Sequence, residues 1–440
     1  MTQFQALRPA DRRLFLLLTA AVLFLAAMLG WRLVGGANVP PPDGPARAFV
    51  PATTAESVAG LRAQLAEAPS AERYAALGLA LLQQVRETAD PALYAQAETA
   101  LDEALARDPR QLDALVGQGM LALARHDFAT ALAWGEQARA IMPYRADALG
   151  ILVDGHVELG QYDQAVAAAQ AMVDLRPDIA SYSRVAYLRE LHGDTPGAIE
   201  AMRAAADAGA PQSEATAWAL VQLGNLHFNS NDHAAAAAAY DEARRAVIDY
   251  PHALAGLARV RAAGGDVAGA ITEYERIVAR LPLPEFAITL GRLYEADGQP
   301  DAAAAQYGLV RTIQQLNAEA GMDVDLELAL FEADHGDPAS ALRMAEAAYA
   351  RRPSLYAADA LAWANYRAGR PDEAQALMEQ ALRLGTQDPL LFYHAGMIAA
   401  ARGDTAAAGT HLQHALDLNP SFDFLHAPQA AATLATLQGK

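Results

Sequence analysis

The chain has 440 residues, a net charge of −19, 53% hydrophobic residues and no cysteine. The lack of cysteine excludes disulfides, thiolate catalysis and zinc–thiolate sites. The first 32 residues hold four arginines and one aspartate, so the remainder carries −22, a charge that repels phosphate backbones and argues against nucleic-acid binding.

An uncharged run of 18 residues lies near the N-terminus, from Leu14 to Trp31. As a helix it would be about 27 Å long, close to the ~30 Å hydrocarbon layer of a bilayer. Three arginines precede the run and only Arg32 follows it closely, so the positive-inside rule predicts a cytoplasmic N-terminus and an extracytoplasmic body. We therefore expect a cytoplasmic segment at 1–13 and a single transmembrane helix, a signal anchor, at 14–33, placing the body on the periplasmic side of a bacterial inner (cytoplasmic) membrane.

Two alternatives remain open for this hydrophobic run. One is a cleaved signal peptide, because Gly35, Gly36 and Ala37 provide small residues at a possible cleavage site. The run is nevertheless longer than the apolar core of about 7–15 residues found in most signal peptides. The other alternative is a buried helix of a soluble protein.

A proline-rich linker is expected next, at 34–52, with five prolines between Ala37 and Pro51. Thr53 and Glu56 then have the spacing of a capping box, which predicts a helix through about Ala66. The segment 53–69 is therefore either a cap for the apolar edge of the structure that follows or a loosely ordered linker helix.

Ten alanines recur at gaps of 33, 34 or 38 residues, the mark of stacked helix pairs. Glycine or asparagine stands five residues before most of them, as expected where a helix ends in a left-handed residue. A proline two residues after some of these turn residues is expected at the first position of the next helix. A proline twelve residues after the alanine is expected to end the second helix. The two 38-residue gaps predict a longer second helix or loop at Asp207–Thr216 and Gln314–Asp323. The alanines are Ala97, Ala131, Ala165, Ala198, Ala236, Ala270, Ala303, Ala341, Ala374 and Ala408. The turn residues are Gly160, Gly193, Asn231, Gly265, Gly298, Gly336, Gly369 and Gly403. The prolines are Pro300, Pro338 and Pro371 at starts, and Pro109, Pro143, Pro177, Pro282, Pro353 and Pro420 at stops.

This register resembles the tetratricopeptide repeat (TPR) family over residues 70–420. The seventh unit, for example, reads Leu290-Gly291, Tyr294, Ala303 and Tyr307. The resemblance implies an all-α fold, a right-handed α-solenoid of about ten helix hairpins whose first helices line a concave groove. A capping helix is expected in the C-terminal segment 421–440, at Ala427–Leu437, with a partner-binding tail as the alternative.

The chemistry expected of this chain is recognition, without catalysis and without a cofactor. The sequence contains no nucleophile elbow, phosphate-binding loop or zinc-protease motif. His411 and His414 lie three residues apart on an expected helix, with His394 and His426 nearby in sequence. A metal site there is the weaker interpretation, because no carboxylate completes a ligand motif.

Aromatic and arginine side chains on the first helices are expected to line the groove, since such residues dominate binding hot spots. The alternative interpretation of each aromatic side chain is that it packs between helices. The chaperone-binding TPR subclass clamps a carboxylate with lysines and asparagines, and the one lysine here is Lys440, so that mode is not expected. Arg184 and Arg259 are candidates for contact with another carboxylate. The candidate residues are Arg184, Tyr187, Trp218, Asn225, Phe228, Arg259, Tyr356, Trp363, Tyr366, Tyr393 and Met397, of which the C-terminal five form the denser cluster.

These patterns predict a non-catalytic, membrane-anchored scaffold or assembly factor that binds a protein or an extended peptide in its groove. Two alternatives stay open. One is a binding protein for a small ligand, metal or haem that uses the C-terminal histidines. The other is a structural component that assembles with copies of itself as a homo-oligomer.

Overall fold

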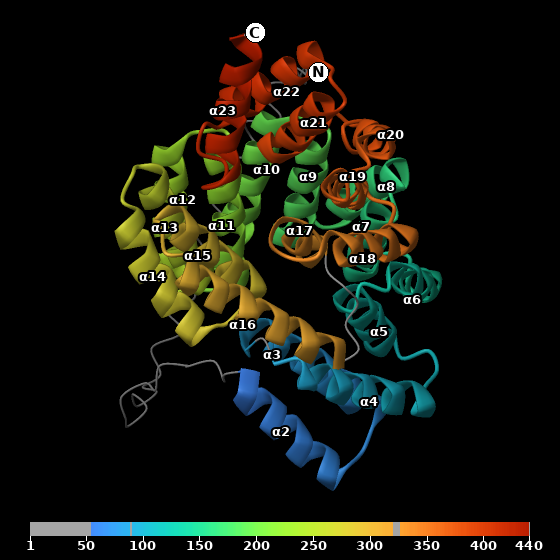
Figure 1. Cartoon of the computed structure of the whole chain (residues 1–440). Helices are drawn as coiled ribbons and strands as arrows, with labels where there is room; N and C mark the ends of the chain where they lie inside the picture. The colour runs from blue at the N-terminus through green and yellow to red at the C-terminus, as the bar shows by residue number, and fades with distance from the viewer. Residues whose placement is uncertain (1–53, 89, 320–325, 440) are drawn as a thin grey trace, which may run out of the picture. The chain divides into compact units, whose positions relative to one another are not determined.

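The computed structural model describes residues 54–88, 90–319 and 326–439. The chain divides into two units at Ala52, and all of the described residues belong to the second unit. The described residues form 22 α-helices and no strand (Figure 1). The segments predicted at 1–13, 14–33 and 34–52 lie outside the described residues. Within the described residues, every helix is too short or too polar to span a lipid bilayer.

The helices follow one another as antiparallel pairs with short connections (Figure 1). We number the pairs as repeats 1 to 10, from α3/α4 to α21/α22. The helices are α2 (Thr54–Glu67), α3 (Ala71–Thr88), α4 (Ala92–Arg107), α5 (Leu112–Ala124), α6 (Phe128–Ile141), α7 (Ala146–Glu158), α8 (Tyr162–Leu175), α9 (Ile179–Leu191), α10 (Thr195–Ala208), α11 (Glu214–Asn229), α12 (His233–Ala246), α13 (Pro251–Ala263), α14 (Val267–Arg280), α15 (Pro284–Ala296), α16 (Pro300–Glu319), α17 (Leu326–His335), α18 (Pro338–Arg351), α19 (Leu355–Arg367), α20 (Pro371–Ala381), α21 (Pro389–Ala401), α22 (Thr405–Leu418) and α23 (His426–Gln438).

The periodic alanines lie where the two helices of each repeat touch. Each stands on the second helix of its pair and is at most 1% exposed. A methyl group there lets the helices approach closely, because a larger side chain would push them apart. The predicted ten hairpins are therefore confirmed.

The proline and glycine signals also mark the helix ends. All six stop prolines lie two residues beyond the end of a helix, and the three start prolines are the first residues of α16, α18 and α20. Seven of the eight turn residues have positive φ, including Asn231 at 60°. The prediction was wrong at Gly336, which is not left-handed, and it missed His126, which is, at φ 59°. Residue type biases a helix end but does not fix it.

The two wide alanine gaps have different causes. In the first, a loop at 209–213 separates α10 from the 16-residue α11. In the second, α16 extends to 20 residues, whereas most second helices have 14. The first lies where the alanine spacing predicted it, and the lengthened α16 covers the predicted segment up to Glu319, whereas residues 320–323 lie outside the described residues.

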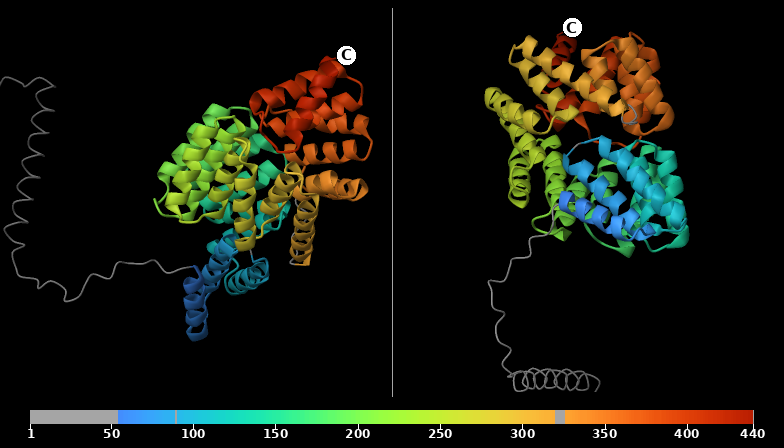
Figure 2. Two further views of the ribbon diagram at one scale, coloured as in Figure 1. Left: turned by 60° about the vertical axis from the view of Figure 1, so that its left-hand side comes forward. Right: turned by 90° about the horizontal axis from the view of Figure 1, so that it is seen from below.

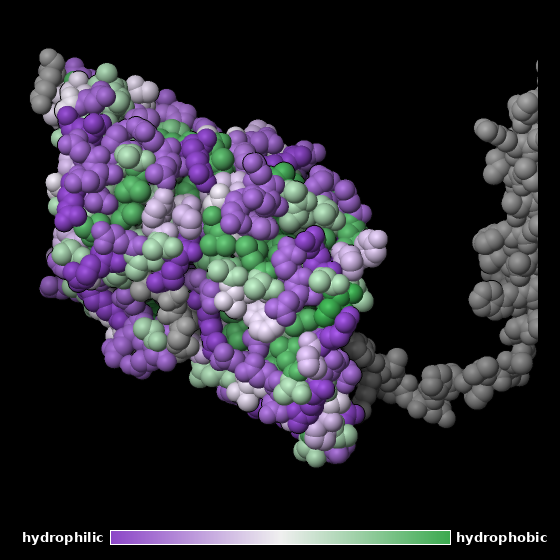
Figure 3. Space-filling model, turned by 90° about the vertical axis from the view of Figure 1, so that its right-hand side faces the viewer, coloured by the Kyte–Doolittle hydropathy of each residue, from purple (hydrophilic) through white to green (hydrophobic). Residues whose placement is uncertain are grey.

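Both ends of the array are covered by a helix, which decides between the two interpretations of the segment 53–69 and agrees with the capping helix expected at the C-terminal end. Val58 and Leu65 of α2 are buried in a cluster with side chains of α3 and α4. At the other end, Ala430 and Leu434 of α23 are buried against α21 and α22. Without such caps a repeat array would expose apolar surface at its ends. On the face shown in Figure 3, apolar side chains form separate patches interrupted by polar ones.

Repeats far apart in the sequence also pack together, which the repeat pattern did not predict. Figures 1 and 2 show α18–α22 beside α7–α11. One apolar cluster joins Val157, Tyr162 and Leu191 of repeats 3 and 4 to Leu355, Met378 and Ile398 of repeats 9 and 10.

These distant repeats meet turn against turn. The Tyr162 hydroxyl accepts a hydrogen bond from the Leu355 amide at 2.7 Å, and Thr386 donates one to the Leu191 carbonyl oxygen at 2.5 Å. The loops that follow repeats 8, 9 and 10 thus dock on the turns within repeats 3, 4 and 5. The contact fixes how the first helices of repeats 3 to 5 face repeats 9 and 10.

Candidate partner-binding site

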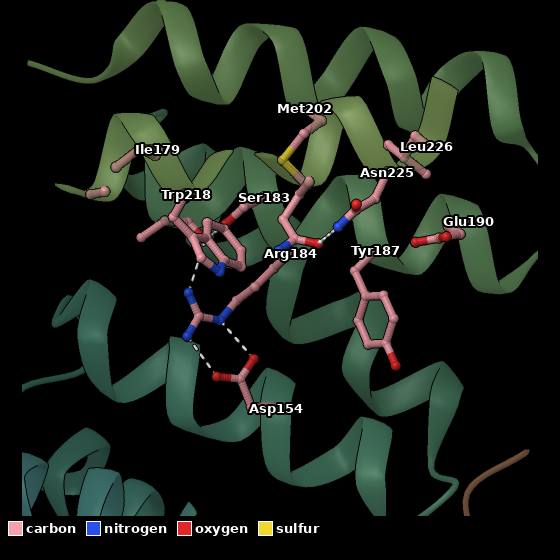
Figure 4. Close-up of a pocket in the computed structure, with 13 residues that line it drawn as sticks. Asp154, Ile179, Ser183, Arg184, Tyr187, Glu190, Met202, Trp218, Asn225 and Leu226 are labelled. Atoms are coloured by element: carbon pink, nitrogen blue, oxygen red, sulfur yellow. Dashed lines mark hydrogen bonds and ion pairs between the residues drawn. The ribbon is translucent and has the colours of Figure 1, made fainter. Parts of the chain in front are cut away.

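A cavity of about 540 Å³ lies over the first helices of repeats 3, 4 and 5 (Figure 4). Residues of α9 and α11 enter it at spacings of three or four, because that spacing returns side chains to one face of a helix. The chain therefore builds the cavity from the same face of consecutive repeats. The lining residues are Asp154 on α7, Ile179, Ala180, Ser183, Arg184, Tyr187 and Glu190 on α9, Met202 on α10, and Ala215, Trp218, Gln222, Asn225 and Leu226 on α11.

Arg184 is held by protein groups on several sides. Its guanidinium donates to both carboxylate oxygens of Asp154, at 2.8 and 2.6 Å, and to the Ala180 carbonyl oxygen at 2.9 Å (Figure 4). A Cβ at position 150 would lie 3.1 Å from Cζ of Arg184, so Gly150 makes room for the group. The paired charge of Arg184 leaves little attraction for a ligand carboxylate.

Glu190 has a different environment. Its carboxylate makes no hydrogen bond or ion pair with any described residue. Burial, and secondly the nearby charge of Asp388, raise its pKa to about 7. Tyr356 belongs to the same surroundings, with its hydroxyl 3.5 Å from Asp388. An unpaired, partly buried carboxylate therefore borders the cavity.

The apolar wall of the cavity centres on Trp218. Its residue surface is 41% exposed, more than that of any other tryptophan in the described residues. Ile179, Met202 and Leu226 line the cavity beside it. A half-exposed tryptophan next to buried apolar side chains is the environment of a binding hot spot.

A second cavity, of about 330 Å³, shares Gln222 and Asn225 with the first. Arg259 lines it, but its guanidinium stacks on Phe228 at 4.1 Å and donates to Asn225 and to the Tyr240 hydroxyl, each at 3.2 Å. Phe228 is 1% exposed. Arg259 is therefore fixed by its neighbours, and Phe228, a candidate groove residue, packs in the interior instead.

The C-terminal candidate cluster is an interior one. Trp363, Tyr393 and Met397 are exposed by 1%, 0% and 8%, and Tyr366 is half-buried. They pack with α17 and the capping helix α23, which cover the face expected to be open. We therefore correct the preferred site from this cluster to repeats 3 to 5. Tyr356 packs against the apolar cluster of repeats 3, 4, 9 and 10, as does Tyr187 of the cavity, and Tyr366 contacts this cluster as well.

A buried charge network lies beneath the C-terminal cluster, and no sequence pattern pointed to it. Asp334 accepts a hydrogen bond from Trp363 Nε1 at 2.8 Å and pairs with Arg367 at 3.1 Å and Arg292 at 3.3 Å. Arg292 also pairs with Asp423 at 2.8 Å, which ties the loop before α23 to α15. The network joins residues up to 131 positions apart and stabilises the C-terminal cap.

The histidines have protein partners. His394 pairs with Asp359 at 2.8 Å and stacks on Trp363. His411 and His414 both contact the Phe392 ring, and His414 also lies 3.1 Å from the Gln387 side chain. Across the described part of the chain, no three histidine, aspartate or glutamate side chains are grouped to hold a metal ion.

The fold and the cavity define an α-helical repeat protein with a binding surface on the first helices of its repeats, an architecture typical of protein-interaction scaffolds that are generally not catalytic. The tetratricopeptide repeat family model matches residues 92–146, 152–214, 221–283 and 360–421. Because these matches cover more than half of the chain, it belongs to the tetratricopeptide repeat family.

Comparison with known proteins adds fold neighbours only. No curated protein sequence matches the chain. Similar solved structures include a human IFIT1 dimer with m7Gppp-AAAA, 16% identical over 74% of this chain and 76% of that chain, with a TM-score of 0.49. The APC/C hetero-tetramer Cut9–Hcn1 is 15% identical over 88% and 67%, with a TM-score of 0.48. A tetratricopeptide repeat protein from Parabacteroides merdae is 17% identical over 59% and 98%, with a TM-score of 0.34.

Proposed function

We propose that this protein is a membrane-anchored scaffold or assembly factor that holds a protein segment or extended peptide in the cavity of repeats 3 to 5. The observation that carries the proposal is the half-exposed Trp218 in a cavity of about 540 Å³ built by consecutive repeats. Peptides in such grooves are recognised by a few anchoring side chains, with aromatic residues contributing most. The body carries −22, so a nucleic acid is not the expected partner.

The anchoring part of the proposal rests on the sequence of Leu14–Trp31 and on the arginines before it. It places the repeats on the extracytoplasmic side of a bacterial cytoplasmic membrane. A tether would raise the effective concentration of the groove for partners at the same membrane.

Photo-crosslinking in intact membranes tests the partner site. A photoreactive amino acid replaces Trp218 in one variant and, as a matched control, Tyr144 in another, because Tyr144 is 81% exposed and lines none of the cavities described here. We expect one defined partner at position 218 only. The purified partner should then bind Trp218→Ala about 30-fold more weakly than the unchanged protein in calorimetry. Equal capture at both positions, or unchanged affinity, would count against the site.

A separate experiment tests the location. Alkaline phosphatase fused after Lys440 should be active in cells, and the protein should stay in the membrane after carbonate extraction. Removal of residues 1–36 should abolish both results. An inactive fusion together with carbonate release would refute the anchor while leaving the cavity intact.

A further inference from the structure

The charges lining the cavity do not balance. It is bordered by two carboxylates, Asp154 and Glu190, and by one guanidinium, that of Arg184. Arg184 and Asp154 neutralise each other's charge through two hydrogen bonds. The charge left without a counter-ion is that of Glu190, so the cavity is anionic when this side chain is ionised.

The surroundings of Glu190 supply no cation. Its carboxylate interacts electrostatically with Tyr187 on its own helix, Tyr356 on α19 and Asp388 before α21. Asp388 accepts a hydrogen bond from the Leu390 amide at 2.9 Å as the N-cap of α21. The negative charge of Asp388 thus acts on Glu190 where repeat 4 meets the loop before repeat 10. A positive group placed there would relieve both their repulsion and the cost of burying Glu190.

The arginines of the cavities do not favour a ligand that carries a carboxylate. Arg184 is paired with Asp154, and Arg259 is stacked on Phe228 and bonded to Asn225. A ligand carboxylate would have to displace these contacts and would approach Glu190, a like charge. The expectation that these arginines contact a carboxylate is therefore not favoured by the geometry.

We propose that the cavity of repeats 3 to 5 selects a partner segment by a lysine or arginine side chain that pairs with Glu190, in the same cavity that Trp218 lines. The apolar wall of Trp218, Met202 and Leu226 takes the methylene stem of that side chain or an adjacent apolar residue. This inference rests on the proposed function, and it names the chemistry that the same site recognises.

The test uses the full-length protein and an array of random decapeptides with acetylated N-termini and amidated C-termini, so that only side chains carry charge. Peptides that bind should share a lysine or arginine. For the strongest binder, fluorescence anisotropy compares the basic peptide with its neutral counterpart, citrulline for arginine or norleucine for lysine. We expect the unchanged protein to prefer the basic peptide by at least about tenfold, because a hydrogen bond to a charged group contributes that much.

Two variants separate the possible explanations. Glu190→Gln should reduce the preference to within about twofold while leaving the neutral peptide bound as before. Glu200→Gln is the matched control, since the Glu200 side chain is 85% exposed on α10, and it should keep the full preference. Circular dichroism establishes that both variants are folded.

The outcomes distinguish this inference from the function on which it rests. Peptides without a basic residue, or an unchanged preference in Glu190→Gln, overturn the cation assignment. If such peptides still lose binding in Trp218→Ala, the cavity remains the partner site. If Trp218→Ala binds every peptide as well as the unchanged protein does, the cavity is not the site and both proposals fall.

Discussion

The side-chain amide of Asn419 donates a hydrogen bond of 2.8 Å to the carbonyl oxygen of Phe228, which lies 191 residues earlier in the chain. Asn419 is fully buried and follows the last helix of repeat 10, whereas Phe228 lies near the end of the first helix of repeat 5. This bond is one of several that dock the loops after repeats 8, 9 and 10 on the turns of repeats 3, 4 and 5.

Asn419→Ala should lower the free energy of unfolding by about 1–3 kcal/mol, because it leaves a buried carbonyl oxygen without its donor. Thermal denaturation followed by circular dichroism measures the change. Gln413→Ala is the control, since Gln413 is exposed on α22 and bonds only to Asp417 of its own helix. Equal stability of the two variants would show that the inter-turn bond contributes nothing.

Two glycines with the same backbone conformation allow the docking contact to be measured. Gly160 and Gly298 have φ of 67° and 75°. A Cβ on Gly160 would lie 2.5 Å from the Pro353 carbonyl oxygen, but one on Gly298 would meet nothing within 4 Å. Alanine at either position should cost about 1 kcal/mol for the left-handed backbone. Gly160→Ala should cost a further ~1–3 kcal/mol for the clash.

The difference between Gly160→Ala and Gly298→Ala in urea denaturation therefore reports the docking of repeat 3 on the loop after repeat 8. Identical unfolding midpoints in the two variants would mean that the turns separate in solution.

Replacing Asp334 tests the buried charge network. Asp334→Asn should destabilise the fold by about 3 kcal/mol, because it leaves the charge of Arg292 with less compensation at a buried site and also removes the ion pair with the more exposed Arg367. Asp372→Asn is the control. Asp372 pairs with Arg402 at 2.9 Å, but its side chain is 82% exposed, so its loss should cost less than about 1 kcal/mol. Similar denaturation midpoints for both variants would contradict the prediction.

The same network makes stability depend on acid. Burial alone would raise the pKa of Asp334, but the hydrogen bond and charge of His426 and the charge of Arg292 lower it well below its usual range. A pKa that is lower in the folded state adds stability above the unfolded value, near 4, and this stability is lost as pH falls. Asp334→Asn should therefore lose less thermal stability than the unchanged protein between pH 5 and pH 3. A parallel loss in both would exclude Asp334 as the titrating group.

Glu190 should produce the opposite dependence. Burial and Asp388 raise its pKa from 4.5 to about 7, so the folded state binds the extra proton and the contribution of Glu190 to stability falls as pH rises from about 4.5 to 7. Glu190→Gln should stabilise the protein by roughly 1–3 kcal/mol at pH 8 and leave it nearly unchanged at pH 4.5. Thermal denaturation at the two pH values checks this. A variant less stable at pH 8 would show that the carboxylate has a stabilising partner.

The candidate site was predictable only in part. Arg184, Tyr187, Trp218 and Asn225 all line one cavity because helical periodicity places them on the same face of consecutive repeats. Phe228, Trp363, Tyr393 and Met397 follow the same periodicity but are buried. Periodicity gives the face of a helix, but it does not say whether another element covers that face.

The ten hairpins, their helix stops and most of their turns could be read from the sequence, since each depends on contacts between residues less than about 40 positions apart and repeats in register. The contacts between distant repeats could not be read from it: Gly160 lies against Pro353, Asp334 contacts Arg292 and Trp363, and Glu190 has no partner of opposite charge. Each repeat adds a small rotation to the one before it. The sum of many such rotations, which no single repeat encodes in its pattern, sets which distant turns come into contact.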